Sequence, residues 1–180
     1  LGIQPDFIIT RSEKFLDQRR RDRLALFCNV SPSNVISSPD LPSVYEVPLV
    51  LHEQKLGTKI LEKLNLSVKP PDLSEWEEFV KKIKVVKSKK ESIEIAIVGK
   101  YFGTGDYQLR DSYAALFDAI DHASYELGIA VKTRWINAQK AEEEKDLEKL
   151  IGNPDGIIVP IGWGIRGAEG MIRTAGYARD

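Results

Sequence analysis

The stretch Gly156-Ile157-Ile158-Val159-Pro160, followed by Gly162-Trp163-Gly164-Ile165-Arg166-Gly167-Ala168-Glu169-Gly170, decides the fold of the second half of the chain. An apolar strand runs into a glycine-rich turn, and a helix is predicted to follow through Met171 to Arg179. In an open α/β sheet, such a turn aims backbone N–H groups at one point beyond the carboxyl end of the strand, where ligands bind. We therefore expect an α/β fold in which this turn lies where such sheets bind ligands.

Strands and helices alternate in the sequence that leads up to this turn. Residues 93–98 read as a buried strand, and Asp111 or Ser112 can cap a helix that ends at Gly128. Residues 131–136 read as the next strand, and residues 142–150 as a short charged helix. A strand–helix–strand–helix–strand order predicts right-handed crossovers and a parallel sheet.

The first half of the chain shows the same two kinds of element. Residues 7–10 and 34–38 read as short strands, and residues 17–29 as a helix with a strongly basic face. Residues 47–64 carry apolar side chains at helical spacing. The first half is therefore a second α/β segment.

A segment with two prolines and a lysine-rich stretch separates the two halves. Pro70 and Pro71 break the chain, and Ser74 with Glu77 forms a capping box that opens a short helix. Residues 81–90 contain six lysines and few apolar residues, so we expect a solvated linker there.

Composition excludes several classes of protein. The 26 basic and 27 acidic residues nearly cancel, so no global field favours nucleic acid or a membrane surface. The single cysteine, Cys28, allows no disulfide framework, and His52 and His122 lack metal-ligand spacing. No long apolar run or signal peptide is present, and the chain does not begin with Met. We expect a soluble, cytoplasmic segment of a longer polypeptide.

Two interpretations of the turn at 162–167 are open from its residues. Its backbone amides can hold a carboxylate or the oxyanion of a tetrahedral intermediate, because glycines allow close approach. Alternatively, the stretch is an ordinary tight connection between a strand and a helix.

The order and spacing of several segments resemble the middle of the CTP synthase family, most closely its archaeal branch. The resemblance covers essentially all 180 residues and rests on Gly2-Ile3-Gln4-Pro5-Asp6, Ala25-Leu26-Phe27-Cys28-Asn29-Val30, Val35-Ile36-Ser37-Ser38, Tyr45-Glu46-Val47-Pro48, Val98-Gly99-Lys100-Tyr101 and Arg166-Gly167-Ala168-Glu169-Gly170-Met171-Ile172.

The resemblance implies a two-domain, glutamine-dependent ligase of pyrimidine biosynthesis. Residues 1–66 would be the end of a P-loop-type synthetase domain, and residues 67–91 the interdomain linker. Residues 92–180 would be the first half of a flavodoxin-like class I glutamine amidotransferase domain. In such an enzyme L-glutamine is hydrolysed to ammonia, ATP phosphorylates UTP, and ammonia displaces the phosphate to give CTP.

The resemblance also assigns nucleotide-binding positions in the first half. Arg23 matches a basic residue that faces the UTP or CTP phosphates, although it could also be a solvated charge on the basic helix. Arg11 matches a residue near the adenine of ATP, and Pro39, Asp40 and Leu41 match the loop that reads the adenine. Relatives usually carry Lys at the Pro39 position, and Pro lacks a backbone N–H.

In the second half, Gly162 matches the glutamine-binding glycine of the oxyanion loop. Many relatives carry Gly where this chain has Ile161, so Ile161 is expected to adopt a backbone angle that favours glycine. Arg166, Gly167 and Glu169 match positions tied to GTP activation and to the domain interface, although Arg166 and Glu169 could equally form a salt bridge.

The resemblance places the catalytic residues outside this sequence. The phosphate loop and magnesium carboxylates would precede residue 1, and the nucleophilic cysteine with its histidine and glutamate would follow residue 180, so the 180 residues alone should be inactive. The implied cofactors and partners are ATP with Mg2+, GTP as activator, CTP as product and inhibitor, and a homotetramer. One alternative is a non-catalytic scaffold, which is favoured by the departures from the family at Pro39, Ile161 and Ala114, the last of which replaces a frequent Lys. The other alternative is a flavodoxin-like nucleotide- or carboxylate-binding domain of other function.

Overall fold

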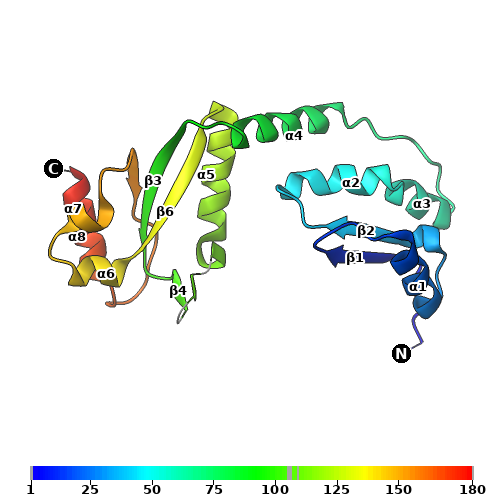
Figure 1. Cartoon of the computed structure of the whole chain (residues 1–180), viewed down its shortest axis with the longest axis horizontal. Coiled ribbons are helices and arrows are strands. Elements are labelled where there is room, and N and C mark those ends of the chain that lie inside the picture. Colours follow the sequence, from blue (N-terminus) through cyan, green and yellow to red (C-terminus); the bar gives the residue numbers. More distant parts are fainter. Residues whose placement is uncertain (1, 105–106, 109, 180) are drawn as a thin grey trace. The chain divides into compact units, whose positions relative to one another are not determined.

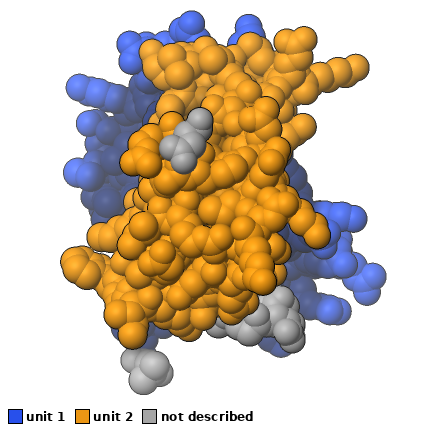
Figure 2. Space-filling view, turned by 90° about the vertical axis from the view of Figure 1, so that its left-hand side faces the viewer, with its two compact units in different colours: residues 1–81 blue, residues 82–180 orange. Residues whose placement is uncertain are grey.

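The computed structural model describes residues 2–104, 107–108 and 110–179, so part of the glycine-rich segment 102–110 lies outside the described residues. The chain divides into two compact units, residues 1–81 and 82–180, which Figure 2 colours separately. The division falls inside the predicted linker at 67–91, whereas the two domain boundaries themselves stay predictions.

Unit 1 contains the two predicted strands, which pair in parallel. Strand β1 (Ile8–Ser12) runs beside β2 (Val35–Pro39), with Ile8 opposite Val35 and Ser12 opposite Pro39. The other elements are α1 (Gln18–Cys28), η1 (Pro32–Asn34), η2 (Val44–Glu46), α2 (Val47–Glu53) and α3 (Leu56–Lys63), seen in Figure 1. The predicted basic helix 17–29 is therefore confirmed within a residue at each end.

Two side-chain interactions hold unit 1 together besides its small apolar core. The carboxylate of Asp17 accepts a hydrogen bond from the Arg20 N–H, which caps the start of α1. The amide side chain of Gln54 accepts from the Ser37 N–H and donates to the Ser37 carbonyl, both at 2.8 Å, so it satisfies the free edge of β2.

Lys55 adopts a left-handed conformation (φ 59°), which splits the predicted helical stretch 47–64 into α2 and α3.

The lysine-rich stretch 81–90 differs from the predicted solvated linker. Helix α4 (Ser74–Lys87) runs through most of it, and Ile83 and Val86 are almost fully buried. Apolar residues at helical spacing bury one face, while the lysines between them stay in water. The start of α4 also differs from the predicted capping box, because the Ser74 N–H donates to the carboxylate of Asp72.

Unit 2 contains the predicted parallel sheet, with strand order β6–β3–β7. Its central strand is β3 (Ser92–Gly99), flanked by β6 (Ala130–Asn137) and β7 (Gly156–Ile158). Helix α5 (Ala114–Leu127) connects β3 to β6, helices α6 (Ala138–Glu143) and α7 (Leu147–Ile151) connect β6 to β7, and α8 (Ala168–Arg179) follows β7. The two-residue strands β4 (Gly103–Thr104) and β5 (Tyr107–Gln108) and the 3-10 turn η3 (Arg110–Tyr113) lie between β3 and α5.

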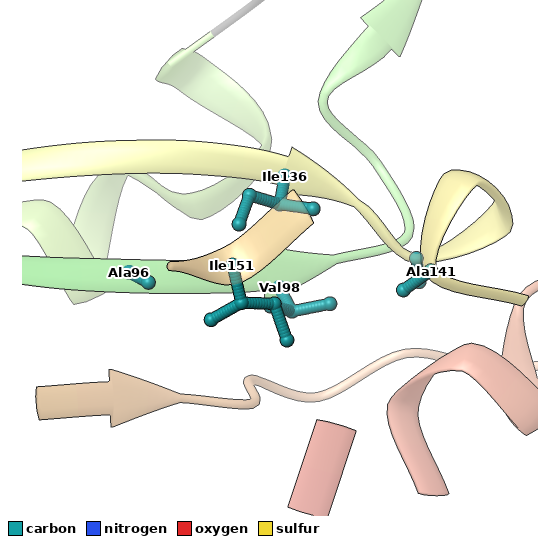
Figure 3. Close-up of a cluster of buried hydrophobic side chains, with 6 residues drawn as sticks. Ala96, Val98, Ile136, Ala141 and Ile151 are labelled. Carbon is teal, nitrogen blue, oxygen red and sulfur yellow. The ribbon is translucent and has the colours of Figure 1, made fainter. Parts of the chain in front are cut away.

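Helices cover both faces of this sheet, because successive residues of β3 point to opposite sides. Ala96 and Val98 pack on the face covered by α6 and α7, with Ile136, Ala141 and Ile151, as Figure 3 shows. The opposite face is covered by α5 and contains Ile97, Phe102, Tyr113 and Phe117. In Figure 1, α5 lies on one side of β3 and β6, and α6, α7 and α8 lie on the other.

No helix within the described part of the chain is long and apolar enough to cross a membrane.

Candidate functional site

The candidate site of unit 2 lies at the carboxyl ends of β3 and β7. The connection from β3 leads to β6 on one side, and the next connection returns to β7 on the other side. Adjacent parallel strands whose connections leave in opposite directions open a crevice at their carboxyl ends, where α/β proteins bind ligands. Lys100 and Tyr101 follow β3 there, and the loop 161–165 follows β7.

Lys100 supports the loop from behind. The Lys100 side chain is only 5% exposed, and its ammonium donates a 2.5 Å hydrogen bond to the Gly164 carbonyl. The stem of the same lysine lies against Gly162, where an added Cβ would come within 2.7 Å of the Lys100 Cδ. A larger residue at position 162 would therefore displace the Lys100 side chain.

Two tyrosines hold the loop at further points. The Tyr113 hydroxyl donates to the Ile161 carbonyl (3.1 Å) and accepts from the Lys100 N–H (3.0 Å). The Trp163 N–H donates to the Tyr101 hydroxyl at 2.6 Å. The expectation of bare amides is therefore wrong for Trp163, whose N–H is already engaged within the unit.

The remaining loop amides have a different status. Among the described residues, the N–H groups of Gly162, Gly164 and Ile165 donate no hydrogen bond. Gly164 has a φ of 80°, which favours glycine. Ile161 is not among the described residues with positive φ, so its predicted strain is wrong, and this substitution gives no support to a disabled scaffold.

Apolar side chains surround these amides at the surface. Ile161, Trp163 and Ile165 are 67%, 79% and 93% exposed. Their exposure places the loop at the surface of the described unit, with its backbone reachable from outside.

The three positions after the loop have separate environments. Gly167 is buried with a φ of 71°, and a Cβ there would lie 3.1 Å from the Ala138 Cβ. Arg166 and Glu169 are both exposed, and no ion pair joins them in the part of the chain that the structure describes. The salt-bridge alternative for this pair is therefore wrong.

The predicted adenine-binding residues of unit 1 lie together. Arg11 and Asp40 form an ion pair with 3.2 Å between Nη2 and Oδ1, and their side chains are 87% and 56% exposed. Pro39 is buried at the end of β2, and Leu41 is half-buried just after it. Because an ion pair this exposed contributes little stability, its partners remain available to a ligand.

Arg23 lies in a basic patch on α1. It lines a surface cavity of about 230 Å3 together with Asp17, Arg19 and Arg20. The backbone N–H of Arg20 holds the pKa of Asp17 below its usual value, and the guanidinium of Arg20 adds to the effect. Three guanidinium groups around one cavity suit a phosphate chain, because Arg binds phosphate oxygens in a forked geometry.

The described residues show neither a metal centre nor a catalytic pair at these sites. No group of three or more His, Cys, Asp and Glu side chains among them could hold an ion. Cys28, half-buried in unit 1, belongs to a different unit from the loop.

Lys100, Tyr101 and Tyr113 are the site residues that the sequence did not predict. Their contacts join segments far apart in the chain, which spacing alone does not reveal. The available signal was the position of Lys100 and Tyr101 directly after a predicted strand of a parallel sheet.

Comparison with known proteins finds a family match within each unit. Residues 108–180 match the family described as glutamine amidotransferase class-I, and residues 1–66 match the family described as CTP synthase N-terminus. Unit 2 thus carries part of a class I glutamine amidotransferase domain, in agreement with its parallel sheet.

Whole-chain similarities agree with both matches. The chain is 45% identical to a CTP synthase of Saccharolobus solfataricus, 47% identical to one of Pyrococcus abyssi and 43% identical to one of Caldanaerobacter subterraneus subsp. tengcongensis. Each match covers 100% of this chain and 33%, 32% and 32% of the relative, respectively. The chain is similar over its whole length to these CTP synthases, and it spans about a third of the length of these curated relatives.

Proposed function

We propose that the protein to which this chain belongs converts UTP to CTP, using ATP and ammonia derived from glutamine. The observation that carries the proposal is the similarity of the whole chain to CTP synthases, across both family matches. The two candidate sites agree with it, since one suits nucleotides and the other suits an acyl group.

Unit 2 would serve glutamine hydrolysis. The N–H groups of Gly162 and Ile165 would stabilise the oxyanion that forms on the glutamine amide carbon when a nucleophile attacks it. The nucleophile is expected outside these 180 residues, as is its base. The chain therefore supplies oxyanion stabilisation, and the 180 residues alone should not hydrolyse glutamine.

Unit 1 would bind nucleotides. Arg23 and its neighbouring arginines would pair with the phosphates of UTP or of the product CTP. The Arg11 guanidinium would stack on the adenine of ATP, while the Asp40 carboxylate would accept from its exocyclic amine. The Leu41 backbone would add a second hydrogen bond to the same ring.

Several finer properties are also proposed on the family resemblance. Mg2+ would accompany ATP, with ligands outside this chain, and GTP would activate glutamine hydrolysis near Arg166, Gly167 and Glu169. The protein would be a cytoplasmic homotetramer. Titration of glutaminase activity with GTP tests the activation. Sedimentation with and without nucleotides tests the tetramer.

The test of the main proposal is CTP formation by the full-length protein. Product should appear with UTP, ATP, Mg2+ and glutamine, and it should disappear when any one of them is left out. Ammonium chloride should replace glutamine. Failure to form CTP from either nitrogen source would reject the proposal and would favour a scaffold.

A further inference from the structure

We propose that Lys100 and Tyr113 are positioning residues that orient two peptide groups of the loop 161–165, so that the Gly162 and Ile165 N–H groups point toward the acyl group. The inference rests on the proposed glutamine hydrolysis and adds the residues that set the geometry of its oxyanion site. Neither side chain needs to touch the substrate.

The orientation follows from the planarity of the peptide bond. In a trans peptide, the carbonyl of one residue and the N–H of the next point in opposite directions. Tyr113 holds the Ile161 carbonyl, so the Gly162 N–H points away from Tyr113. Lys100 holds the Gly164 carbonyl, so the Ile165 N–H points away from Lys100. Both supports come from the body of the unit, and both N–H groups therefore face outward.

Lys100 also contributes its charge. Among the described residues, no carboxylate lies within 4.0 Å of the Lys100 ammonium, so its charge is not neutralised by an ion pair. A buried positive charge behind the loop attracts negative charge that develops in front of it. Donation to the Gly164 carbonyl also polarises that peptide and strengthens the Ile165 N–H as a donor.

Tyr113 ties the loop to the end of β3. Its hydroxyl bridges the Lys100 N–H and the Ile161 carbonyl, and its ring lies against Gly99, where a Cβ would come within 2.8 Å of the Cε2 atom. Burial raises the pKa of the Tyr113 phenol, so the hydroxyl remains a donor at neutral pH. Loss of this hydroxyl removes one support and leaves the ring packing in place.

The experiment measures glutamine hydrolysis by the full-length protein carrying Lys100→Met, Lys100→Arg or Tyr113→Phe. The matched control is Lys90→Met, because Lys90 is exposed and lies outside the site. Loss of one oxyanion donor in other enzymes lowers kcat by about 100- to 1000-fold, so a misoriented donor should lower kcat by roughly 10- to 100-fold. The KM for glutamine should stay within about threefold, since the interaction acts in the transition state.

Ammonia-driven CTP formation in the same variants separates positioning from folding. It should stay within about twofold of the wild type, Lys100→Arg should recover part of the kcat, and Lys90→Met should behave as wild type. A wild-type kcat for glutamine hydrolysis in both Lys100→Met and Tyr113→Phe would overturn the inference. A loss of ammonia-driven CTP formation as large as the loss of glutamine hydrolysis would overturn it too. Either result would leave the proposed function standing. A wild-type protein without glutaminase activity would instead reject the proposed function, and the inference with it.

Discussion

Gly170 and Gly176 lie on the same helix, α8, in different surroundings. A Cβ at Gly170 would overlap the Ala138 carbonyl oxygen and lie 2.7 Å from the Glu142 nitrogen, whereas a Cβ at Gly176 would meet nothing within 4 Å. Helices α6 and α8 approach closely because position 170 carries no side chain. This contact fixes the helix that follows the candidate loop.

Replacing these two glycines should change stability in opposite directions. Gly170→Ala should lower the free energy of unfolding by about 1–3 kcal/mol, because backbone atoms cannot move away cheaply. Gly176→Ala should raise it by about 0.5–1 kcal/mol through helix propensity alone. Urea unfolding measures both, and equal effects of the two substitutions would contradict the close contact.

Arg23 allows a test of the nucleotide site. Arg23→Ala should raise the UTP concentration needed for half-maximal CTP formation by about tenfold, because a charge-assisted hydrogen bond to phosphate is lost. Arg23→Lys should retain most of the affinity, since an ammonium also binds phosphate. Steady-state kinetics with varied UTP give the answer, and an unchanged UTP dependence in Arg23→Ala would remove Arg23 from the site.

At the scale of the element, helix α1 depends on its cap. Asp17→Ala should lower the melting temperature by a few degrees at pH 7, because the Arg20 N–H loses its acceptor. The pKa of Asp17 is depressed in the folded state, so its contribution is present above the unfolded value of 3.8 and fades as the pH falls through the lower folded value.

Thermal melts of wild type and Asp17→Ala between pH 7 and pH 3 follow this difference. The difference in melting temperature between the two proteins should be largest at pH 7 and should shrink toward pH 3. Asp17→Asn should keep most of the capping at every pH. A difference that grows with acidity would contradict the cap.

Helix α4 separates a buried face from an exposed one. Ile83 is 1% exposed and Val85 is 53% exposed on the same helix. Ile83→Ala should lower the free energy of unfolding by about 2–5 kcal/mol, whereas Val85→Ala should cost well under that. Urea unfolding of both variants tests whether this segment is a packed helix. Small and equal losses of the free energy of unfolding in the two variants would support a solvated linker instead.

An element can be predicted from sequence when its own residues show clear periodicity and clear ends. A feature that depends on contacts between distant segments cannot be predicted in this way. The predictions of β3 and β6 and of the end of α5 at Gly128 are confirmed, because these segments carry strong periodicity and clear ends. The predicted cap at Asp111 or Ser112 is wrong, because both residues lie in η3 and α5 begins after Tyr113 without a side-chain cap. The buried face of α4 consists of only Val80, Ile83 and Val86 among many lysines, so the lysines dominated the prediction. The break between α2 and α3 depends on the left-handed conformation of Lys55, which residues other than glycine adopt uncommonly. Gly162 was predicted from its motif, whereas Lys100 reaches the same loop only through the fold.

At the scale of the whole molecule, residues 1–66 match the family described as CTP synthase N-terminus, and residues 108–180 match the family described as glutamine amidotransferase class-I. The loop of unit 2 presents amides suited to an acyl group, and unit 1 presents guanidinium groups suited to phosphates. The CTP synthesis that we propose is therefore to be tested on the full-length protein. The activity that we propose for the full-length protein transfers nitrogen released from glutamine to the pyrimidine.

Isotope transfer tests this claim most directly. The full-length protein should be incubated with UTP, ATP, Mg2+ and glutamine labelled with 15N at its amide, and the CTP analysed by mass spectrometry. The account predicts that nearly all CTP carries one added mass unit and that Lys100→Met slows the labelled product while ammonia-driven synthesis continues. CTP without the label, or no CTP at all, would contradict the account.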